Sequence, residues 1–352
     1  MQWSIYILVI SLVLIEQAWG TQPVPIRPGE ADQAYQRGVR LQQEGRLAEA
    51  IEAFRSTLRL APTRAFVYVK LKEAYGRGRT GDQVGTELKA KADQDGADFV
   101  SWNLLGVLYA KQGRWAEAIA ALERTVQIQP ADVDAWTNLG WLSSELKQSQ
   151  KAREAFRRAL ALDSAYGRAH AGLAGLYAET EGEYDKAIEE YRLALAAEPG
   201  NSDYLYDMGW VYYRKGMTDD ALKILTEAST LSPDDPAGRT KIGWARLRRK
   251  EYQVAIEEFE RALRAQPEYT FARFGLARAL QAEGNDDAAV VEYKRAWREA
   301  NNDVYLLYLV RLYLQRNLWA VFLAVIFTAG LTLVWLIRRR RLPQDPQATF
   351  GK

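Results

Sequence analysis

The chain contains no cysteine and only one histidine among its 352 residues. Without cysteine, a disulfide, a thiolate nucleophile and a cysteine-based metal site are all excluded. Since His170 is the only imidazole, Ser-His-Asp and Cys-His arrangements are nearly excluded as well, because each depends on a positioned histidine. These absences predict that the protein is not an enzyme.

Motifs for cofactors and metals are also weak. Residues 76–81 fit the spacing of a phosphate-binding glycine motif, but no strand precedes them, and that motif requires a strand. Asp93, Asp95 and Asp98 lack the glycine offset and the closing glutamate of a calcium loop. The sequence therefore predicts neither a cofactor nor a bound metal.

The long central region has no marked excess of either positive or negative charge. Residues 21–317 carry 42 basic and 43 acidic side chains. A protein that binds nucleic acid usually shows a clustered basic excess. No nucleic-acid partner is predicted, and the chain's formal net charge of +2 comes from its basic C-terminal end.

A period of 34 residues runs through the chain, with one slip of a single residue. Alanine marks it at Ala50, Ala118, Ala152, Ala187, Ala221, Ala255 and Ala289, with Val84 at the missing position. Glycine follows the same period at Gly38, Gly106, Gly140, Gly209 and Gly243. A fixed period of this length indicates a solenoid of stacked units. The slip lies between Thr180 and Tyr184, where we expect a turn that is one residue longer.

Each period predicts a pair of helices. In residues 99–132, Trp102, Leu105 and Tyr109 share one helical face, and Gly113 follows at the break between the two helices. Ala118 opens the pattern of the second helix, and the proline at position 130 stops it. Neither helix can bury its apolar face alone, so neighbouring pairs must stack.

This pattern resembles the tetratricopeptide repeat, which implies an all-α fold: a right-handed α-solenoid of about eight two-helix repeats. The copies span 31–64, 65–98, 99–132, 133–166, 167–201, 202–235, 236–269 and 270–303. The second copy departs from the pattern, because Lys72 replaces the small residue. His170 stands where Trp102 and Trp136 stand in sister copies, which predicts a packing role for it.

The resemblance also implies a function. Members of the family line a concave groove with their first helices and grip an extended peptide or a helix of a protein partner there. By position, the groove candidates in this chain are Tyr35, Asn103, Trp141, Tyr206, Trp210, Tyr213, Arg214, Trp244, Arg248, Phe274 and Arg278. Aromatic residues with arginine nearby are typical binding anchors. Two alternatives stay open: the tryptophans pack between repeats, or the groove binds a glycan in polysaccharide export.

Both ends of the chain predict a membrane context. Residues 1–20 contain an apolar run at 5–15 and read as a signal peptide, followed by a proline-rich tether at 21–30. Near the other end, residues 318–337 carry no charge, and 12 of these 20 are Leu, Ile, Val or Phe. Twenty residues of helix at about 1.5 Å each span a hydrocarbon core of about 30 Å. We therefore expect a transmembrane helix at 318–337.

The basic tail sets the expected orientation. Arg338 to Arg341 follow the apolar run at once, and such residues stay in the cytoplasm. The tail at 338–352 is then cytoplasmic, and anionic lipid is an expected partner of these arginines. Residues 304–317 are expected to form a capping, juxtamembrane helix with Leu307, Val310 and Leu314 on one face. The predicted protein is a scaffold in a bacterial inner membrane, single-pass after signal cleavage, with periplasmic repeats that assist an envelope complex. The alternative topology is a tail-anchored adaptor with cytosolic repeats.

Overall fold

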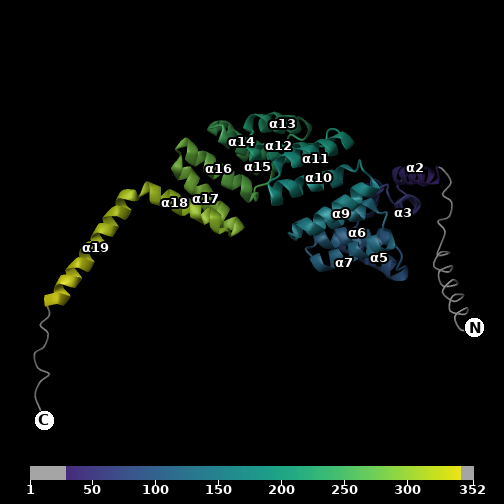
Figure 1. Ribbon diagram of the computed structural model, residues 1–352, viewed down its shortest axis with the longest axis horizontal. Helices are drawn as coiled ribbons and strands as arrows, with labels where there is room; N and C mark the ends of the chain where they lie inside the picture. Colours follow the sequence, from purple (N-terminus) through teal and green to yellow (C-terminus); the bar gives the residue numbers. More distant parts are fainter. Residues whose placement is uncertain (1–28, 342–352) are drawn as a thin grey trace, which may run out of the picture. The chain divides into compact units, whose positions relative to one another are not determined.

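The computed structural model describes residues 29–341, and every regular element in that range is helical (Figure 1). The predicted signal peptide, the tether up to residue 28 and residues 342–352 lie outside the described part. The chain divides into two compact units, here called the N-terminal unit, up to Pro199, and the C-terminal unit, from Gly200 onwards.

In the N-terminal unit the helices pair in the order of the repeats. They are α2 (Glu30–Gln43), α3 (Leu47–Leu60), α4 (Val67–Gly76), α5 (Gly81–Gln94), α6 (Phe99–Lys111), α7 (Trp115–Ile128), α8 (Val133–Glu145), α9 (Ser149–Leu162), α10 (Gly167–Leu176), the π-helix η1 (Tyr177–Glu181) and α11 (Tyr184–Ala197).

The C-terminal unit continues the same alternation and ends in two further helices. Its elements are α12 (Ser202–Lys215), α13 (Thr218–Leu231), α14 (Pro236–Arg248), α15 (Tyr252–Ala265), α16 (Thr270–Glu283), α17 (Asp286–Ala300), α18 (Asp303–Arg316) and α19 (Leu318–Arg341).

Successive first helices are neighbours within each unit. In the N-terminal unit α6 contacts α8, and α8 contacts α10; in the C-terminal unit α12 contacts α14, and α14 contacts α16. Each second helix that is followed by another first helix of the same unit packs between its own first helix and that next one, as α7 does between α6 and α8. Because the first helices approach one another directly, they form the inner layer of each unit, and the exposed side of that layer is here called the first-helix face.

The periodic small residues let these helices approach closely. Ala118, Ala152 and Ala255 are fully buried. At Gly140 an added Cβ would lie 2.6 Å from the ring of Phe156, and at Gly172 only 2.3 Å from the same ring. Phe156 therefore fills space that two glycines leave free, one in its own repeat and one in the next.

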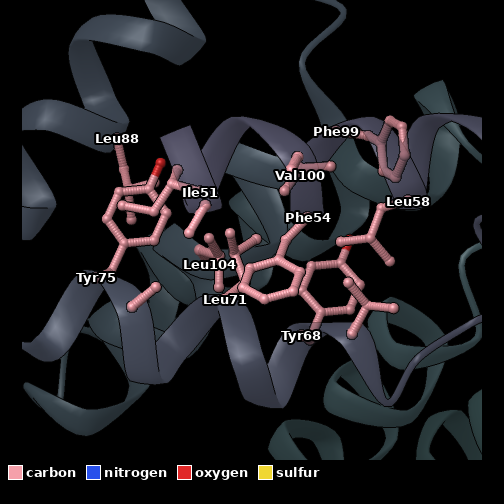
Figure 2. Close-up of a cluster of buried hydrophobic side chains, with 14 of the residues drawn as sticks. Ile51, Phe54, Leu58, Tyr68, Leu71, Tyr75, Leu88, Phe99, Val100 and Leu104 are labelled. Atoms are coloured by element: carbon pink, nitrogen blue, oxygen red, sulfur yellow. The ribbon is translucent and has the colours of Figure 1, made fainter. Parts of the chain in front are cut away.

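The large residues of the N-terminal unit fill the gaps between its helices (Figure 2). Phe54 and Leu58 of α3 belong to one buried cluster with Tyr68 and Leu71 of α4 and with Leu104 of α6. Burial of such side chains contributes about 1.5 to 3 kcal/mol each relative to exposure. The hydrophobic core is thus continuous across the first three repeats.

The one-residue slip does not lengthen the turn between two helices, as the sequence analysis expected. The extra residue is taken up inside the helix, where α10 passes into the π-helix η1 and ends at Gly182 in the left-handed conformation (φ 64°). A single insertion widens one helical turn in this way and leaves the rest of the helix in register. The prediction placed the irregularity correctly but gave it the wrong form.

The capping helix α18 packs through a face other than the one that carries Leu307, Val310 and Leu314. Leu309 and Leu312 are buried against α17, and Tyr305 packs in the same cluster. Leu307, Val310 and Leu314 are exposed instead, with Leu307 at 66%. The pattern is apolar on both sides of the helix, so spacing alone did not distinguish the packed face from the free one.

The last helix, α19, contacts α18. Its described apolar side chains are exposed at consecutive positions, including Leu323, Val325, Ile326 and Phe327. Within the described residues, no helix meets the combined length and hydropathy expected of a membrane span. The side chains of residues 319–321, 324 and 337–341 are not among those described.

Candidate functional site

Three predicted groove residues belong to the N-terminal unit, and they lie in different settings. Trp141 of α8 is 37% exposed and meets the buried ring of Phe156 edge-on at 5.7 Å. Tyr35 of α2 is half-buried and contacts Phe66 at 5.3 Å between ring centroids. Asn103 of α6 is fully buried. Of the three, Trp141 offers the most surface to a partner, and Asn103 offers none.

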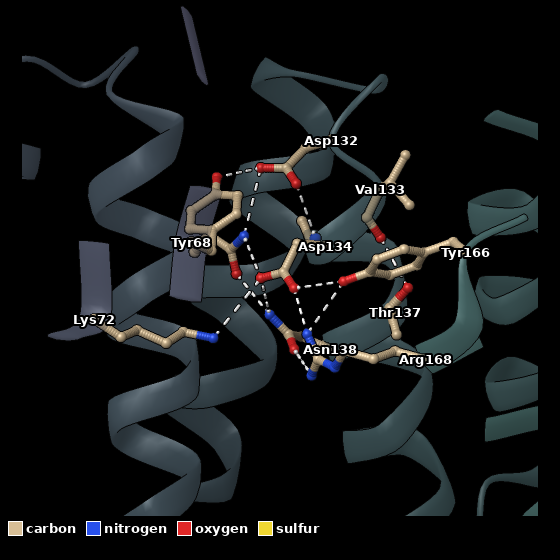
Figure 3. Close-up of polar contacts among 11 residues, drawn as sticks. Tyr68, Lys72, Asp132, Val133, Asp134, Thr137, Asn138, Tyr166 and Arg168 are labelled. Carbon is tan, nitrogen blue, oxygen red and sulfur yellow. Dashed lines mark hydrogen bonds and ion pairs between the residues drawn. The ribbon is translucent and has the colours of Figure 1, made fainter. Parts of the chain in front are cut away.

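Asn103 instead belongs to a buried polar network that joins four first helices, α4, α6, α8 and α10, and most of its other members are labelled in Figure 3. Its amide nitrogen donates to Asp132 at 3.4 Å and to Asp134 at 3.3 Å. Asn138 donates to Asn103 and to Asp134, each at 2.9 Å. Tyr68 donates its hydroxyl proton to Asp132 at 2.5 Å. These hydrogen bonds link α4, α6 and α8, and so fix how their repeats stack.

Cations close the outer side of this network. Arg168 of α10 forms an ion pair with Asp134, and Lys72 of α4 lies 3.9 Å from the same carboxylate. Tyr166 also donates to Asp134, at 3.1 Å. Burial alone would raise the pKa of Asp134, but the Lys72 and Arg168 charges, together with the hydrogen bonds from Asn138 and Tyr166, hold that pKa below its usual value. Asp134 is thus the charged centre of the network.

Asp132 behaves in the opposite way. Burial first, and the neighbouring charge of Asp134 second, raise the pKa of Asp132 to about 7. Its carboxyl accepts the Ala135 backbone N–H at 3.0 Å, which caps the start of α8. Two carboxyl groups in one buried site do not both ionise easily, so their environments push the two pKa values apart.

This shift predicts how pH acts on the N-terminal unit. The folded chain keeps a proton on Asp132 between about pH 4 and about pH 7, where the unfolded chain has lost it, so stability falls as pH rises through that window. Asp132→Asn cannot titrate and keeps an acceptor for the Ala135 N–H. Relative to wild type, its free energy of unfolding should rise by roughly 2 to 3 kcal/mol from about pH 5 to about pH 8. Urea denaturation at the two pH values measures this, and an unchanged difference would contradict the assignment.

His170 lies in α10 of the same unit and has a structural setting. It is buried, its Nδ1 lies 2.7 Å from Glu190 of α11, and its Nε2 lies 3.0 Å from the carbonyl oxygen of Ser164. The hydrogen bond with Glu190, partly offset by burial, raises the pKa of His170. The imidazole therefore ties two helices together, in keeping with the packing role expected for it.

In the C-terminal unit, two of the predicted groove residues belong to the core. Tyr206 is buried and donates its hydroxyl proton to the Ser232 carbonyl at 2.8 Å. Phe274 is buried among Tyr293, Tyr305 and Tyr308. Burial leaves neither side chain free for direct contact with a partner.

Trp244 lies between the buried core residues and the exposed candidates in its accessibility. Its ring is half-buried and stacks on Phe271 at 5.5 Å, and it meets Phe259 edge-on at 5.7 Å and Phe274 at 5.8 Å. These contacts join two hydrophobic clusters of the unit. Trp244 therefore packs between repeats, which is the alternative that the sequence analysis left open, while part of its surface remains accessible.

The remaining predicted residues lie on or beside an open pocket. Trp210 stacks on Tyr213 at 4.6 Å, and Arg248 lies over the Tyr213 ring at 3.6 Å. Arg278 lies over Tyr308 at 4.8 Å. Arg214 is half-buried on the last turn of α12. The pocket has a volume of about 580 Å³ and is lined by Tyr213, Trp244, Leu247, Arg248, Lys250, Tyr252, Arg278, Gln281, Ala282, Tyr308, Arg311 and Gln315.

The sequence analysis missed several residues of the pocket in the C-terminal unit and of the polar network in the N-terminal unit. Tyr252, Tyr308 and Arg311 line the pocket but lie outside the groove positions inferred from the repeat pattern. Lys72 was noticed only as a departure from the period, although that departure places a cation beside Asp134. A charged residue at a position that the pattern reserves for a small one was therefore an available signal.

The comparisons with known proteins agree with this architecture. Sequence models described as tetratricopeptide repeat match residues 98–165, 137–202, 178–243 and 246–313, which together exceed half of the chain. The type IV pilus assembly protein PilF of Pseudomonas aeruginosa is 35% identical over 133 residues, covering 37% of this chain and 52% of PilF. Anaphase-promoting complex subunit 3 of Schizosaccharomyces pombe is 26% identical over 171 residues, covering 49% of this chain and 26% of the relative. The chain thus spans only about a quarter to a half of these relatives.

A solved structure shows the same fold. The crystal structure of the Cut9–Hcn1 hetero-tetramer of the anaphase-promoting complex aligns with a TM-score of 0.66 and 16% sequence identity, over 82% of this chain and 57% of the other. At that identity the likeness extends to the helical solenoid alone.

Proposed function

Because the chain belongs to the tetratricopeptide-repeat family, we propose that it is a non-enzymatic scaffold that binds a protein partner on its first-helix faces. One observation carries the proposal: the first-helix face of the C-terminal unit opens into a pocket with aromatic and arginine side chains in its wall. Such side chains dominate the energy of protein interfaces. Trp141 gives the face of the N-terminal unit an exposed aromatic of its own.

A protein partner fits these surfaces better than a glycan does. Sugar rings stack on open aromatic faces, whereas the Tyr213 and Tyr308 rings beside the pocket already carry a side chain on one face. Arg248 and Trp210 both lie against Tyr213, and Arg278 lies over Tyr308. What the pocket leaves available is the polar edge of the guanidinium groups, which suits carboxylates and peptide carbonyls.

The proposal includes a membrane anchor at residues 318–337. Supporting it are the absence of charge over these 20 residues and the exposure of the described apolar side chains of α19. Their 12 Leu, Ile, Val and Phe residues would favour insertion by roughly 4 to 7 kcal/mol. The exposed face of α18, formed by Leu307, Val310 and Leu314, leads directly into this helix.

The proposed location is a bacterial inner membrane, with the repeats on the periplasmic side and the tail at 338–352 in the cytoplasm. The apolar run at 5–15, read as a signal peptide, and the four arginines at 338–341 both support this orientation. The relative PilF is described as a pilus assembly protein. The proposed role is therefore to assist the assembly of an envelope complex.

Site-specific photo-crosslinking in intact cells tests partner binding. A photoreactive phenylalanine analogue at Trp141 or Trp210 should capture a discrete protein partner, because both positions lie on first-helix faces. Leu193 of α11 and Leu231 of α13 supply matched controls, being exposed apolar residues on second helices. We expect adducts at the first pair and none at the controls. Adducts of equal yield at all four positions would show that the first-helix faces are not selective.

A further inference from the structure

The pocket in the C-terminal unit has an unusual balance of charge. Arg248, Lys250, Arg278 and Arg311 line it, and among the described residues no acidic side chain does. None of these four cations forms an ion pair within the described part of the chain. Arg248 donates one hydrogen bond to the Tyr213 carbonyl oxygen. The other donors of the four side chains are left without a carboxylate partner.

Two acidic residues of the same unit are paired with cations outside the pocket lining. Glu251 pairs with Arg246 at 2.6 Å and with Arg249 at 2.9 Å, and Asp287 pairs with Arg316 at 2.7 Å. Cations are stabilised near the C-terminal ends of helices, where Arg248 lies, by the helix dipole. The helix dipole therefore explains why one cation lies at a helix end. It does not explain why four cations line one pocket that no acidic side chain lines.

Two of these cations lie over aromatic rings. The guanidinium carbon of Arg248 lies 3.6 Å from the centroid of the Tyr213 ring, and that of Arg278 lies 4.8 Å from the Tyr308 ring. Stacking on a ring occupies the face of the guanidinium plane and leaves its N–H groups directed outward along the edges. A preorganised guanidinium loses less side-chain entropy when it binds a carboxylate.

We propose that this pocket binds the acidic side chains of a partner segment, with Arg278 and Arg311 as the principal contacts and Arg248 and Lys250 at the rim. The proposal rests on the proposed function and adds the chemistry of the partner: a stretch of protein rich in aspartate and glutamate. Carboxylates supply the bidentate acceptors that guanidinium groups prefer. The open pocket, of about 580 Å³, has room for more than one such side chain.

Fluorescence anisotropy with the full chain in detergent micelles tests this. The probe is a dye-labelled, C-terminally amidated peptide of alternating glutamate and alanine, compared with the same peptide carrying glutamine or lysine. We expect the glutamate peptide alone to bind, and the affinity to fall when salt is raised from about 0.05 M to about 0.5 M. The Arg278→Gln, Arg311→Gln double variant should weaken binding by about tenfold or more.

A charge-matched control separates the pocket from the general field of the unit. Arg261→Gln with Arg264→Gln removes the same charge from α15, where both side chains are exposed and lie outside the pocket. We expect this control to bind nearly as tightly as the wild type. An equal loss in both double variants would overturn the proposal, as would equal binding of the glutamate and glutamine peptides.

Other ligand sources give different outcomes. If only a peptide with a free C-terminal carboxylate binds, the pocket recognises a chain end and the assignment to acidic side chains is wrong. If phosphatidylglycerol vesicles bind through Arg278 and Arg311 while the peptide does not, the ligand is a lipid headgroup. If the glutamine or lysine peptide binds and Trp210→Ala weakens it, the acidic chemistry fails while partner binding on this face stands. The absence of any peptide binding, with no photo-crosslinks, would remove both proposals.

Discussion

Replacing Phe156 by alanine is expected to lower the free energy of unfolding of the N-terminal unit by about 3 to 5 kcal/mol. The ring is completely buried in α9 and fills the space beside Gly140 and Gly172. Since the helices on both sides pack against it, the cavity left by alanine could close only if two repeats moved. Chemical denaturation of the full chain measures the effect, and a loss below about 1 kcal/mol would show that the repeats collapse around the gap.

A substitution at Gly172, in the repeat that follows Phe156, tests the same interface a second time. Gly172→Ala would place its Cβ 2.3 Å from Phe156, so the variant must shift the ring or the helix. Overpacking of this kind costs about 1 to 3 kcal/mol. Phe156→Leu relieves the crowding, and the double variant should therefore lose less stability than the sum of the two single variants. Additive losses would mean that the ring and the glycine are not coupled.

The C-terminal unit repeats this arrangement and explains part of the sequence pattern. Phe259 lies between Gly243 and Gly275, whose added Cβ atoms would fall 2.7 and 2.3 Å from its ring. The large ring of Phe259 thus occupies the space that the two glycines, Gly243 and Gly275, leave free. Of the two glycines, the one on the 34-residue period was recognised from the sequence, but its partner in the following repeat was not.

The helical fold could be predicted from the sequence because the same residue pattern recurs in successive repeats. A residue that departs from the pattern in one copy, such as Val84, is outweighed by the alanines in the others. The π-helix at Tyr177–Glu181 was not foreseen, because one inserted residue can be absorbed in a turn or within a helix, and both give the same spacing. The free face of α18 was not foreseen either, because its sequence is apolar on both sides.

The site was harder to predict, since binding and packing use the same residue types. Trp244 and Phe274 follow the first-helix positions, yet their rings meet other aromatic rings within their unit. No repeat pattern specifies that Asp134 would gather Lys72 and Arg168 from two other repeats. Such contacts depend on side-chain reach across neighbouring helices, which spacing within one helix does not encode.

The orientation of the chain has the largest predicted effect of all, because the outcome is all or none. If the repeats lie outside the cytoplasm and residues 318–337 cross the membrane, a reagent that cannot pass the inner membrane should reach the repeats but not the tail. The natural absence of cysteine makes this measurement clean, since any introduced cysteine is the only thiol in the chain. Asp219, which is highly exposed on α13, provides a position in the repeats, and Gln347 provides one in the tail.

Single-cysteine labelling in intact spheroplasts with a membrane-impermeant maleimide therefore tests most directly the central claim, that the repeats form a scaffold anchored outside the cytoplasm. The account predicts that Asp219→Cys is labelled before lysis and that Gln347→Cys is labelled only after it. Labelling of Gln347→Cys in intact spheroplasts, with Asp219→Cys protected until lysis, would contradict the claim and place the repeats in the cytosol.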